Sequence, residues 1–138
     1  MTRHILVVDD HRGSRQALAE LLQVEGYEVS EARDGATALA ICTLNDVDAA
    51  VVDYTLPDID GVRLTGELRE TRPNLAVIVV SSVTKYRLSG GKLAANDHAN
   101  AAKNAGASAF LSKPLDIGTL LASLHAVVGR RRPRKSCG

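Results

Sequence analysis

The sequence contains little cysteine and few aromatic residues. It has two cysteines, Cys42 and Cys137, and no tryptophan, and aromatic residues make up 3% of the chain. Cys42 lies in an apolar helical pattern and Cys137 near the C-terminal end, so the pair is no disulfide framework and we expect a reducing, cytoplasmic compartment. The shortage of aromatic side chains also leaves little that could stack on nucleic-acid bases.

Long apolar runs are missing too. No run approaches the roughly 18–20 residues that a helix needs to cross a bilayer, so we expect no membrane association. The first four residues lead directly into a short apolar segment, without the layout of a secretory signal peptide. With 138 residues, 45% hydrophobic and 24% charged, the chain has the length and composition of one globular domain.

The net charge of +1 hides an uneven distribution. Five of the 17 basic residues lie close together, namely Arg130, Arg131, Arg132, Arg134 and Lys135. The rest of the chain then carries 12 basic and 16 acidic residues, a net charge of −4. A negative body argues against nucleic-acid binding by this domain itself, because neutralising phosphates requires clustered Lys and Arg. We interpret residues 130–138 as a basic tail or linker.

Short apolar runs alternate with helical patterns along the chain, which indicates a parallel sheet with crossover helices. The expected strands are residues 5–8, 27–31, 49–52, 76–80 and 109–111. Residues 27–31 alternate between apolar and polar side chains and therefore predict an edge strand. The first, third and fourth of these strands are apolar throughout, as strands covered on both faces should be.

Five helices are expected between and after these strands. They begin at Ser14, Asp34, Asp60, about Asn96 and Asp116; Gly26 ends the first and the third closes before Pro73. The fold class is therefore α/β, a doubly wound five-stranded parallel sheet of order 2-1-3-4-5 with five helices, flavodoxin-like in its layering. In such sheets, ligand sites collect at the carboxyl ends of the strands.

Three carboxylates follow two strands that are neighbours in this order. Asp9 and Asp10 come directly after the first strand, and Asp53 closes the third. Like charges brought together at one rim need a compensating cation, and oxygen ligands of this kind suit Mg²⁺. The alternative is that Asp9 or Asp10 caps the first helix and Asp53 begins a turn. Three carboxylates on one rim favour the metal site.

Two further polar residues are expected at the same rim. Lys113 follows the fifth strand, where its ammonium group can balance the acid cluster and hold a phosphoryl oxygen. Ser81 ends the fourth strand and offers a hydroxyl group to another phosphoryl oxygen. Together with the carboxylates, these residues predict Asp53 as a nucleophile that forms an acyl phosphate with Mg²⁺.

At this point the sequence resembles the bacterial response-regulator receiver domains of two-component systems, a chemotaxis-regulator-like superfamily. The matching strings are Val7-Val8-Asp9-Asp10, the segment from Asp53 to Gly61, Val79-Val80-Ser81-Ser82, and the stretch from Gly106-Ala107 to Lys113-Pro114. The similarity covers about residues 4–129. It implies a receiver domain over residues 1–129, and it implies that Asp53 receives a phosphoryl group from a histidine kinase or phosphotransfer protein.

The resemblance also implies a role for each site residue. Asp9, Asp10 and Asp53 would bind Mg²⁺, joined by the backbone carbonyl of Thr55. Lys113 would contact the phosphoryl group, and Ser81 and Phe110 would act as the switch residues. The last of these implications is that the peptide bond between Lys113 and Pro114 is cis.

The sequence departs from the family pattern between residues 83 and 95, where the chain carries about ten extra residues. In the family, the helix that follows, the fifth strand and the fifth helix form the dimer and output face. The insertion therefore argues against the usual dimer, and we expect a monomer or a weak phosphorylation-dependent dimer. Output would come from a downstream protein partner or from an output domain outside this chain.

Three alternative functions fit the residues less well. An aspartate-nucleophile phosphohydrolase would carry a second Asp two residues after the nucleophile, where Thr55 stands, so we expect no enzyme beyond self-phosphorylation and autodephosphorylation. A flavodoxin-like cofactor binder would place a phosphate loop after the first strand, where Asp9 and Asp10 would repel it. A degenerate receiver that only binds proteins is disfavoured by the intact acid, hydroxyl and lysine set.

Overall fold

A computed structural model describes residues 2–81, 102–113 and 115–129 of the chain. Five strands form one parallel sheet of order β2-β1-β3-β4-β5, which confirms the predicted order. Their bounds are β1 His4–Val8, β2 Glu28–Ala32, β3 Ala49–Asp53, β4 Ala76–Ser81 and β5 Ala109–Ser112. Since all strands are parallel, their carboxyl ends meet at one rim of the sheet.

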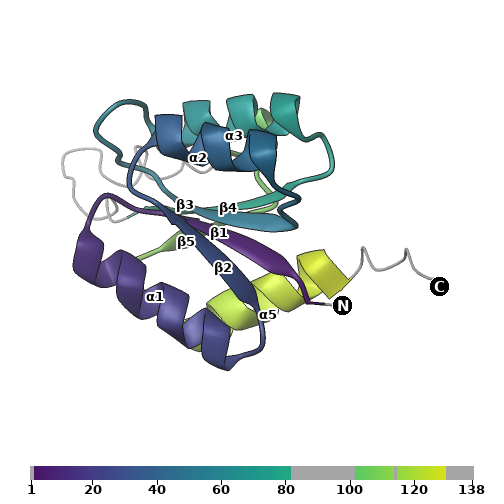
Figure 1. Ribbon diagram of the computed structural model, residues 1–138. Helices are drawn as coiled ribbons and strands as arrows, with labels where there is room; N and C mark the ends of the chain where they lie inside the picture. Colours follow the sequence, from purple (N-terminus) through teal and green to yellow (C-terminus); the bar gives the residue numbers. More distant parts are fainter. Residues whose placement is uncertain (1, 82–101, 114, 130–138) are drawn as a thin grey trace.

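Helices cover both faces of the sheet (Figure 1). Their bounds are α1 Arg12–Val24, α2 Gly35–Leu44, α3 Gly61–Thr71 and α5 Ile117–Gly129. Helices α2 and α3 lie on one face, and α1 and α5 lie on the other. Residues 102–105 are helical as well and form the described end of the expected fourth helix.

Local signals set most of these boundaries. Asp34, Asp60 and Asp116 accept backbone N–H groups at the starts of their helices, as expected of N-terminal caps. Gly26 has a φ of 101° and ends α1. The backbone N–H of Tyr27 donates to the carbonyl of Leu22, so Tyr27 completes the end of the helix, and the edge strand begins one residue later than predicted.

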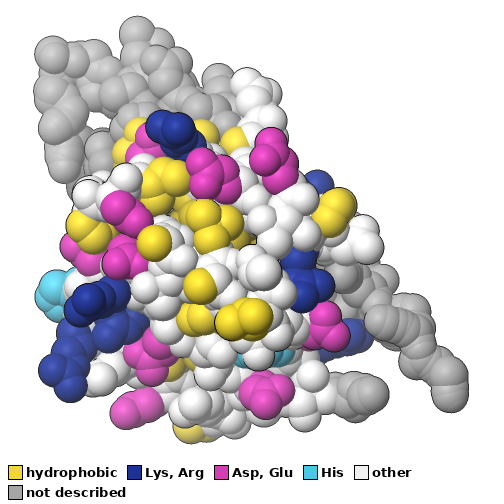
Figure 2. Space-filling model, turned by 45° about the horizontal axis from the view of Figure 1, so that its top comes forward, with side chains coloured by type: hydrophobic (Ala, Val, Ile, Leu, Met, Phe, Trp, Pro, Cys, Tyr) yellow, Lys and Arg dark blue, Asp and Glu magenta, His cyan; other side chains and the backbone are white. Residues whose placement is uncertain are grey.

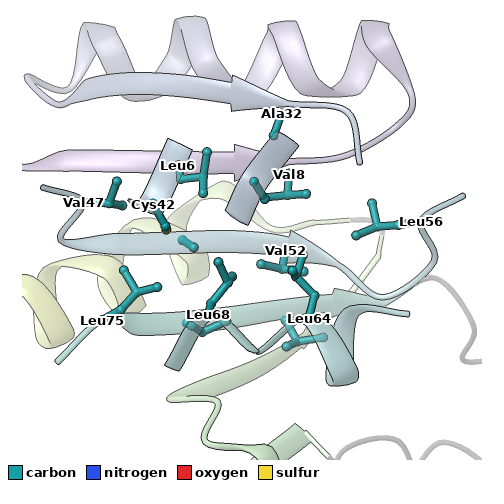
Figure 3. Packing of buried hydrophobic residues seen from close by; sticks show 14 of the residues in the cluster. Leu6, Val8, Ala32, Cys42, Val47, Val52, Leu56, Leu64, Leu68 and Leu75 are labelled. Atoms are coloured by element: carbon teal, nitrogen blue, oxygen red, sulfur yellow. The ribbon is translucent and has the colours of Figure 1, made fainter. Parts of the chain in front are cut away.

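The sheet separates two hydrophobic clusters. Strand side chains such as Leu6, Val8 and Val52 meet α2 and α3 in the first cluster, where Leu64 and Leu68 are fully buried (Figure 3). The second cluster joins the opposite strand faces to α1 and α5. Burial on both faces explains the uninterrupted apolar runs of the central strands. This double packing holds the sheet and hence its carboxyl rim.

On the face seen in Figure 2, Lys and Arg side chains lie among acidic, hydrophobic and uncharged ones, and several of them adjoin one another at the lower left. Among the described helices, none combines the length and apolar character that a membrane span requires.

Several sequence-based expectations fall outside the described residues. These are the insertion at residues 83–95, the start of the helix expected from Asn96, Pro114 with its cis peptide bond, and the basic tail at 130–138. The domain boundary at residue 129 therefore stays a prediction.

Replacing Leu68 with Ala should destabilise the domain strongly. Leu68 has no exposed surface, and truncating such a residue removes its burial and leaves a cavity, at a cost of about 2–5 kcal/mol. Urea unfolding followed by circular dichroism measures this loss. Leu44→Ala is the matched control, because Leu44 is 80% exposed and should change the free energy of unfolding by less than about 0.5 kcal/mol. Equal effects of the two substitutions would contradict the packing.

Candidate metal and phosphoacceptor site

Three carboxylates converge at the carboxyl rim of the sheet. Strands β1 and β3 are neighbours with Val8 opposite Val52, so the residues that follow, Asp9 and Asp53, leave the sheet side by side. One carboxylate oxygen each from Asp9, Asp10 and Asp53 lies within 4.8 Å of the others. The structure thus brings together the three aspartates that the sequence predicted as metal ligands.

Lys113 joins this acid cluster from β5. Its Nζ lies 3.5 Å from Oδ1 of Asp53 and 3.6 Å from Oδ2 of Asp9. The side chains of Asp9 and Asp53 are only 12% and 11% exposed, so solvent screens these ion pairs less than it would at the open surface. The backbone N–H of Lys113 donates to the carbonyl of Ser81 at 2.9 Å, which continues the pairing of β4 with β5 up to the site.

Asp9 is held in place by residues that the sequence analysis did not single out for this role. Its Oδ1 accepts the backbone N–H of His11 at 2.9 Å. The guanidinium group of Arg15 donates to the backbone carbonyl of Asp9 at 3.1 Å and pairs with Glu31 at 2.9 Å. These contacts orient the Asp9 carboxylate toward Lys113 and leave Asp10 as the exposed member of the cluster.

The alternative role of Asp9 or Asp10 as the cap of α1 is wrong. The N-cap is His11, whose Nδ1 accepts the backbone N–H of Ser14 at 3.1 Å. The ring of His11 is exposed and serves as this cap. Helix α1 consequently begins at Arg12, two residues before the predicted start, and both aspartates remain available to a cation.

The environment of Asp53 opposes its ionisation. The pKa of its carboxyl group is raised to about 6, mainly by burial; the negative charges of Asp9 and Asp10 also raise this pKa, whereas Lys113 lowers it. With all three carboxylates ionised, the cluster and Lys113 carry a net charge of −2. A divalent cation would balance this charge and keep Asp53 ionised at neutral pH, so these residues fit Mg²⁺ in charge and in ligand type.

The structure places the other predicted site residues at the end of β4, in the loop after β3 and on β5. Ser81 is buried and stands one residue beyond Val80, the strand partner of Asp53. Thr55 is exposed, and its backbone forms an isolated bridge with Asp60. Phe110 lies on β5, half-buried, and packs against the core on the α2–α3 side.

Gly61 is required at the site for a steric reason that the sequence analysis missed. A Cβ atom there would lie 2.6 Å from the carbonyl oxygen of Asp53 and 2.8 Å from Cα of Tyr54. The N–H of Gly61 also donates to the carbonyl of Tyr54 at 2.6 Å. The start of α3 therefore rests directly on the backbone that carries Asp53, and only glycine allows this approach.

A cavity of about 490 Å³ adjoins the acid cluster. Asp9, Asp53 and Lys113 line part of it, and much of the remaining wall is apolar, from α1, the strands and the start of α5. The cavity thus places Asp9, Asp53 and Lys113 on one wall, beside apolar side chains of α1.

The sequence was compared with known proteins. A family model described as the response regulator receiver domain matches residues 5–125. The response regulator MprA of Mycobacterium tuberculosis (strain ATCC 25177 / H37Ra) is 35% identical over 135 residues, which cover 96% of this chain and 54% of that protein. The chain thus spans about half the length of the curated relatives it matches.

Solved structures agree in fold. A CheY-like receiver domain protein from Methanospirillum hungatei JF-1 has a TM-score of 0.79 at 27% identity, over 94% of this chain and 96% of that one. A response regulator from Burkholderia pseudomallei, with a phosphorylated aspartic acid, a calcium ion and citrate, has a TM-score of 0.75 at 25% identity, over 93% of this chain and 69% of that one.

The raised pKa of Asp53 predicts a specific pH dependence of stability in the absence of metal. Between pH 3.8 and about 6 the folded state binds more protons at Asp53 than the unfolded state does, so this residue makes the free energy of unfolding fall as pH rises through that window. In EDTA, Asp53→Asn should therefore be more stable than the wild type at pH 7.5, and this advantage should shrink toward pH 4. Urea unfolding across the range measures it, and a constant difference would contradict the raised pKa.

Two glycines of α3 should respond in opposite ways to substitution by alanine. Gly61→Ala should destabilise the domain and shift the backbone amide resonances of Asp53 and Tyr54, because the added Cβ collides with their backbone. Gly66→Ala should stabilise it by up to about 1 kcal/mol, since nothing lies within 4 Å of the added atom and alanine favours helix. Urea unfolding and amide NMR spectra test both variants. A stable Gly61→Ala variant with unshifted resonances would refute the contact.

Proposed function

Because this chain belongs to the response regulator receiver domain family, we propose that it carries the signal of a two-component system as a phosphoryl group on Asp53. The observation that supports this role best is the geometry at the rim. Asp9, Asp10 and Asp53 present oxygens within 4.8 Å of one another, with the ammonium group of Lys113 at 3.5 Å from Asp53. A nucleophilic carboxylate, two further acidic ligands and a fixed cation are the groups that phosphoryl transfer to an aspartate requires.

Asp9, Asp10 and Asp53 would hold Mg²⁺, with the backbone carbonyl of Thr55 as a further ligand. When bound, the ion neutralises charge on the phosphoryl oxygens and on the acid cluster. The tight hold of His11 and Lys113 on Asp9 leaves this residue less free to move than Asp10. Asp9 would act on the ion directly or through a water molecule, while Asp10 and Asp53 would offer their oxygens directly.

In the proposed reaction, a carboxylate oxygen of Asp53 attacks the phosphorus atom of a phosphohistidine. The new P–O bond forms as the P–N bond to the imidazole breaks, and the imidazole leaves with the electron pair. Lys113, already fixed beside Asp53, holds a phosphoryl oxygen as its charge develops. The reaction needs no separate catalytic base, because the Asp53 carboxylate carries no proton when a cation is bound.

Phosphorylation would then be read by residues of β4 and β5. An added phosphoryl group brings a charge of about −1.5 to −2 and strong acceptor oxygens. Ser81, one residue beyond the strand partner of Asp53, would respond to it as the first switch residue. Phe110, half-buried against the core, would follow as the second. The two positions bias a protein-binding surface between two states.

The phosphodonor that we propose is a histidine kinase or a phosphotransfer protein. The response regulator from Burkholderia pseudomallei carries a phosphorylated aspartic acid, which supports the same modification here. Because the curated relatives are about twice as long as this chain, the output is proposed to come from a downstream partner or a further domain. We propose residues 1–129 as the receiver domain, in a cytoplasmic protein that is a monomer or a weak phosphorylation-dependent dimer.

The alternatives are less well supported. Thr55 stands where a phosphohydrolase needs its second aspartate, so we propose no turnover of external phosphate esters and only self-phosphorylation and autodephosphorylation. A degenerate receiver would have no reason to keep three aspartates and Lys113 in contact at a cost in electrostatic repulsion.

The proposal predicts that Mg²⁺ and acetyl phosphate add one phosphoryl group to the wild-type protein, because acetyl phosphate supplies the same group without a kinase. Intact-mass spectrometry would detect it. Asp53→Asn should show no such mass shift, and Lys113→Met should reduce the extent of labelling, because the phosphoryl oxygens lose their fixed cation. Leu44→Ala, far from the rim on an exposed helix position, should label as the wild type does. Equal labelling of the wild type and Asp53→Asn would refute Asp53 as the acceptor.

A further inference from the structure

The loop between β3 and α3 is fastened to a helix that lies outside the acid site. In this loop, Asp58 accepts the backbone N–H of Gly35 at 2.9 Å on one carboxylate oxygen and that of Ala36 at 3.0 Å on the other. Both donors belong to the first turn of α2. The contact therefore joins residues that are 22 and 23 positions apart in the sequence.

The N–H groups at the start of a helix have no partner within the helix, and the positive end of the helix dipole attracts an anion there. In α2, Asp34 satisfies the N–H of Thr37 at 2.8 Å, as a local cap does. Asp58, which is distant in the sequence, accepts the N–H groups of the two preceding residues, Gly35 and Ala36. Its carboxylate thus occupies the anion position of the helix with charge-assisted hydrogen bonds, which are stronger than neutral ones.

Close packing reinforces this attachment. Gly35 is buried, and a Cβ atom there would collide with the side chain of Ile59 and touch the carboxylate of Asp58. The absence of a side chain at Gly35 lets the loop lie directly on the start of α2. Two bonds and one steric contact therefore define a clasp, formed by Asp58 and Ile59 on the loop and by Gly35 and Ala36 on the helix.

The same loop leads away from the phosphoacceptor. It starts at Asp53, is bridged within itself by the backbone pairing of Thr55 with Asp60, and ends at Gly61, which packs on the backbone of Asp53. The loop is thus held at two places: at its base, where Gly61 packs on the backbone of Asp53, and farther out, where Asp58 binds the start of α2. Thr55 lies between these two contacts. The carbonyl group of Thr55 can face a cation reproducibly only if the loop keeps this shape.

We propose that Asp58 is a positioning residue for the cation site: it fixes the loop that presents the Thr55 carbonyl and so couples cation binding to the start of α2. This inference rests on the proposed function, because it concerns the same cation. Asp58 itself is exposed and is not a member of the acid cluster. Its effect on the ion passes through the backbone of the loop.

The coupling has a reciprocal consequence. If the clasp favours the loop shape that binds Mg²⁺, then Mg²⁺ must favour the clasp by the same factor. Adding Mg²⁺ to the wild-type protein should therefore slow hydrogen exchange at the amides of Gly35 and Ala36, which Asp58 holds. Amides elsewhere in α2 should change less, because their hydrogen bonds lie within the helix.

The test measures Mg²⁺ affinity and amide exchange by NMR in the wild type, Asp58→Ala, Asp58→Asn and Asp34→Ala. Asp58→Ala should raise the dissociation constant for Mg²⁺ about tenfold, a typical loss for a residue that orients a metal ligand. Asp58→Asn keeps one acceptor oxygen and should lie between Asp58→Ala and the wild type. Asp34→Ala removes the local cap of the same helix and should lower its stability, with less than a twofold change in Mg²⁺ affinity.

The outcomes separate this inference from the proposed function. If Asp58→Ala binds Mg²⁺ within twofold of the wild type, or if Asp34→Ala weakens binding equally, the clasp has no specific role and the inference fails while the metal site stands. If the wild type binds Mg²⁺ but the ion leaves hydrogen exchange at the amides of Gly35 and Ala36 unchanged, the proposed coupling is wrong. This outcome uses only the wild-type protein, so it holds even if a variant does not fold. Failure of the wild type to bind Mg²⁺ at all would overturn both proposals.

Discussion

The repulsion among three carboxylates at the carboxyl rim is the interaction on which the rest of this structure depends. Asp9, Asp10 and Asp53 are brought within 4.8 Å of one another by the pairing of β1 with β3. One ammonium group, from Lys113, offsets part of that repulsion. What remains is a concentration of negative charge that the fold itself creates, because folding places these carboxylates together before any ligand arrives.

Much of this arrangement could be predicted from local sequence signals. Helix starts at Asp34 and Asp60 followed from a capping residue and the pattern after it, and the rim followed from the rule that parallel strands end on one side. The strand at Glu28–Ala32 was predicted one residue early because Tyr27 has the alternation of a strand but donates its N–H to the end of α1. Periodicity does not distinguish these two uses of one residue.

Contacts between distant segments could not be predicted in the same way. Asp58 has no neighbour in the sequence that indicates its bond to α2, and the need for glycine at position 61 arises from the backbone of Asp53, eight residues earlier. Arg15 likewise gains its role from the approach of α1 to the end of β1. In each case the role of the residue depends on a main-chain atom of another element. The residue type alone does not indicate where that atom lies.

The direction of α5 separates the phosphoacceptor from whatever is joined to that helix. Asp116 caps α5 close to Lys113 at the rim, and the helix then runs 13 residues, about 20 Å at 1.5 Å per residue. It ends at the side of the molecule where β1 begins (Figure 1). A module attached there would begin at the opposite end of the sheet from Asp53. Such a module would respond to the domain through the faces of the domain's strands and helices, and it would not touch the modified carboxylate.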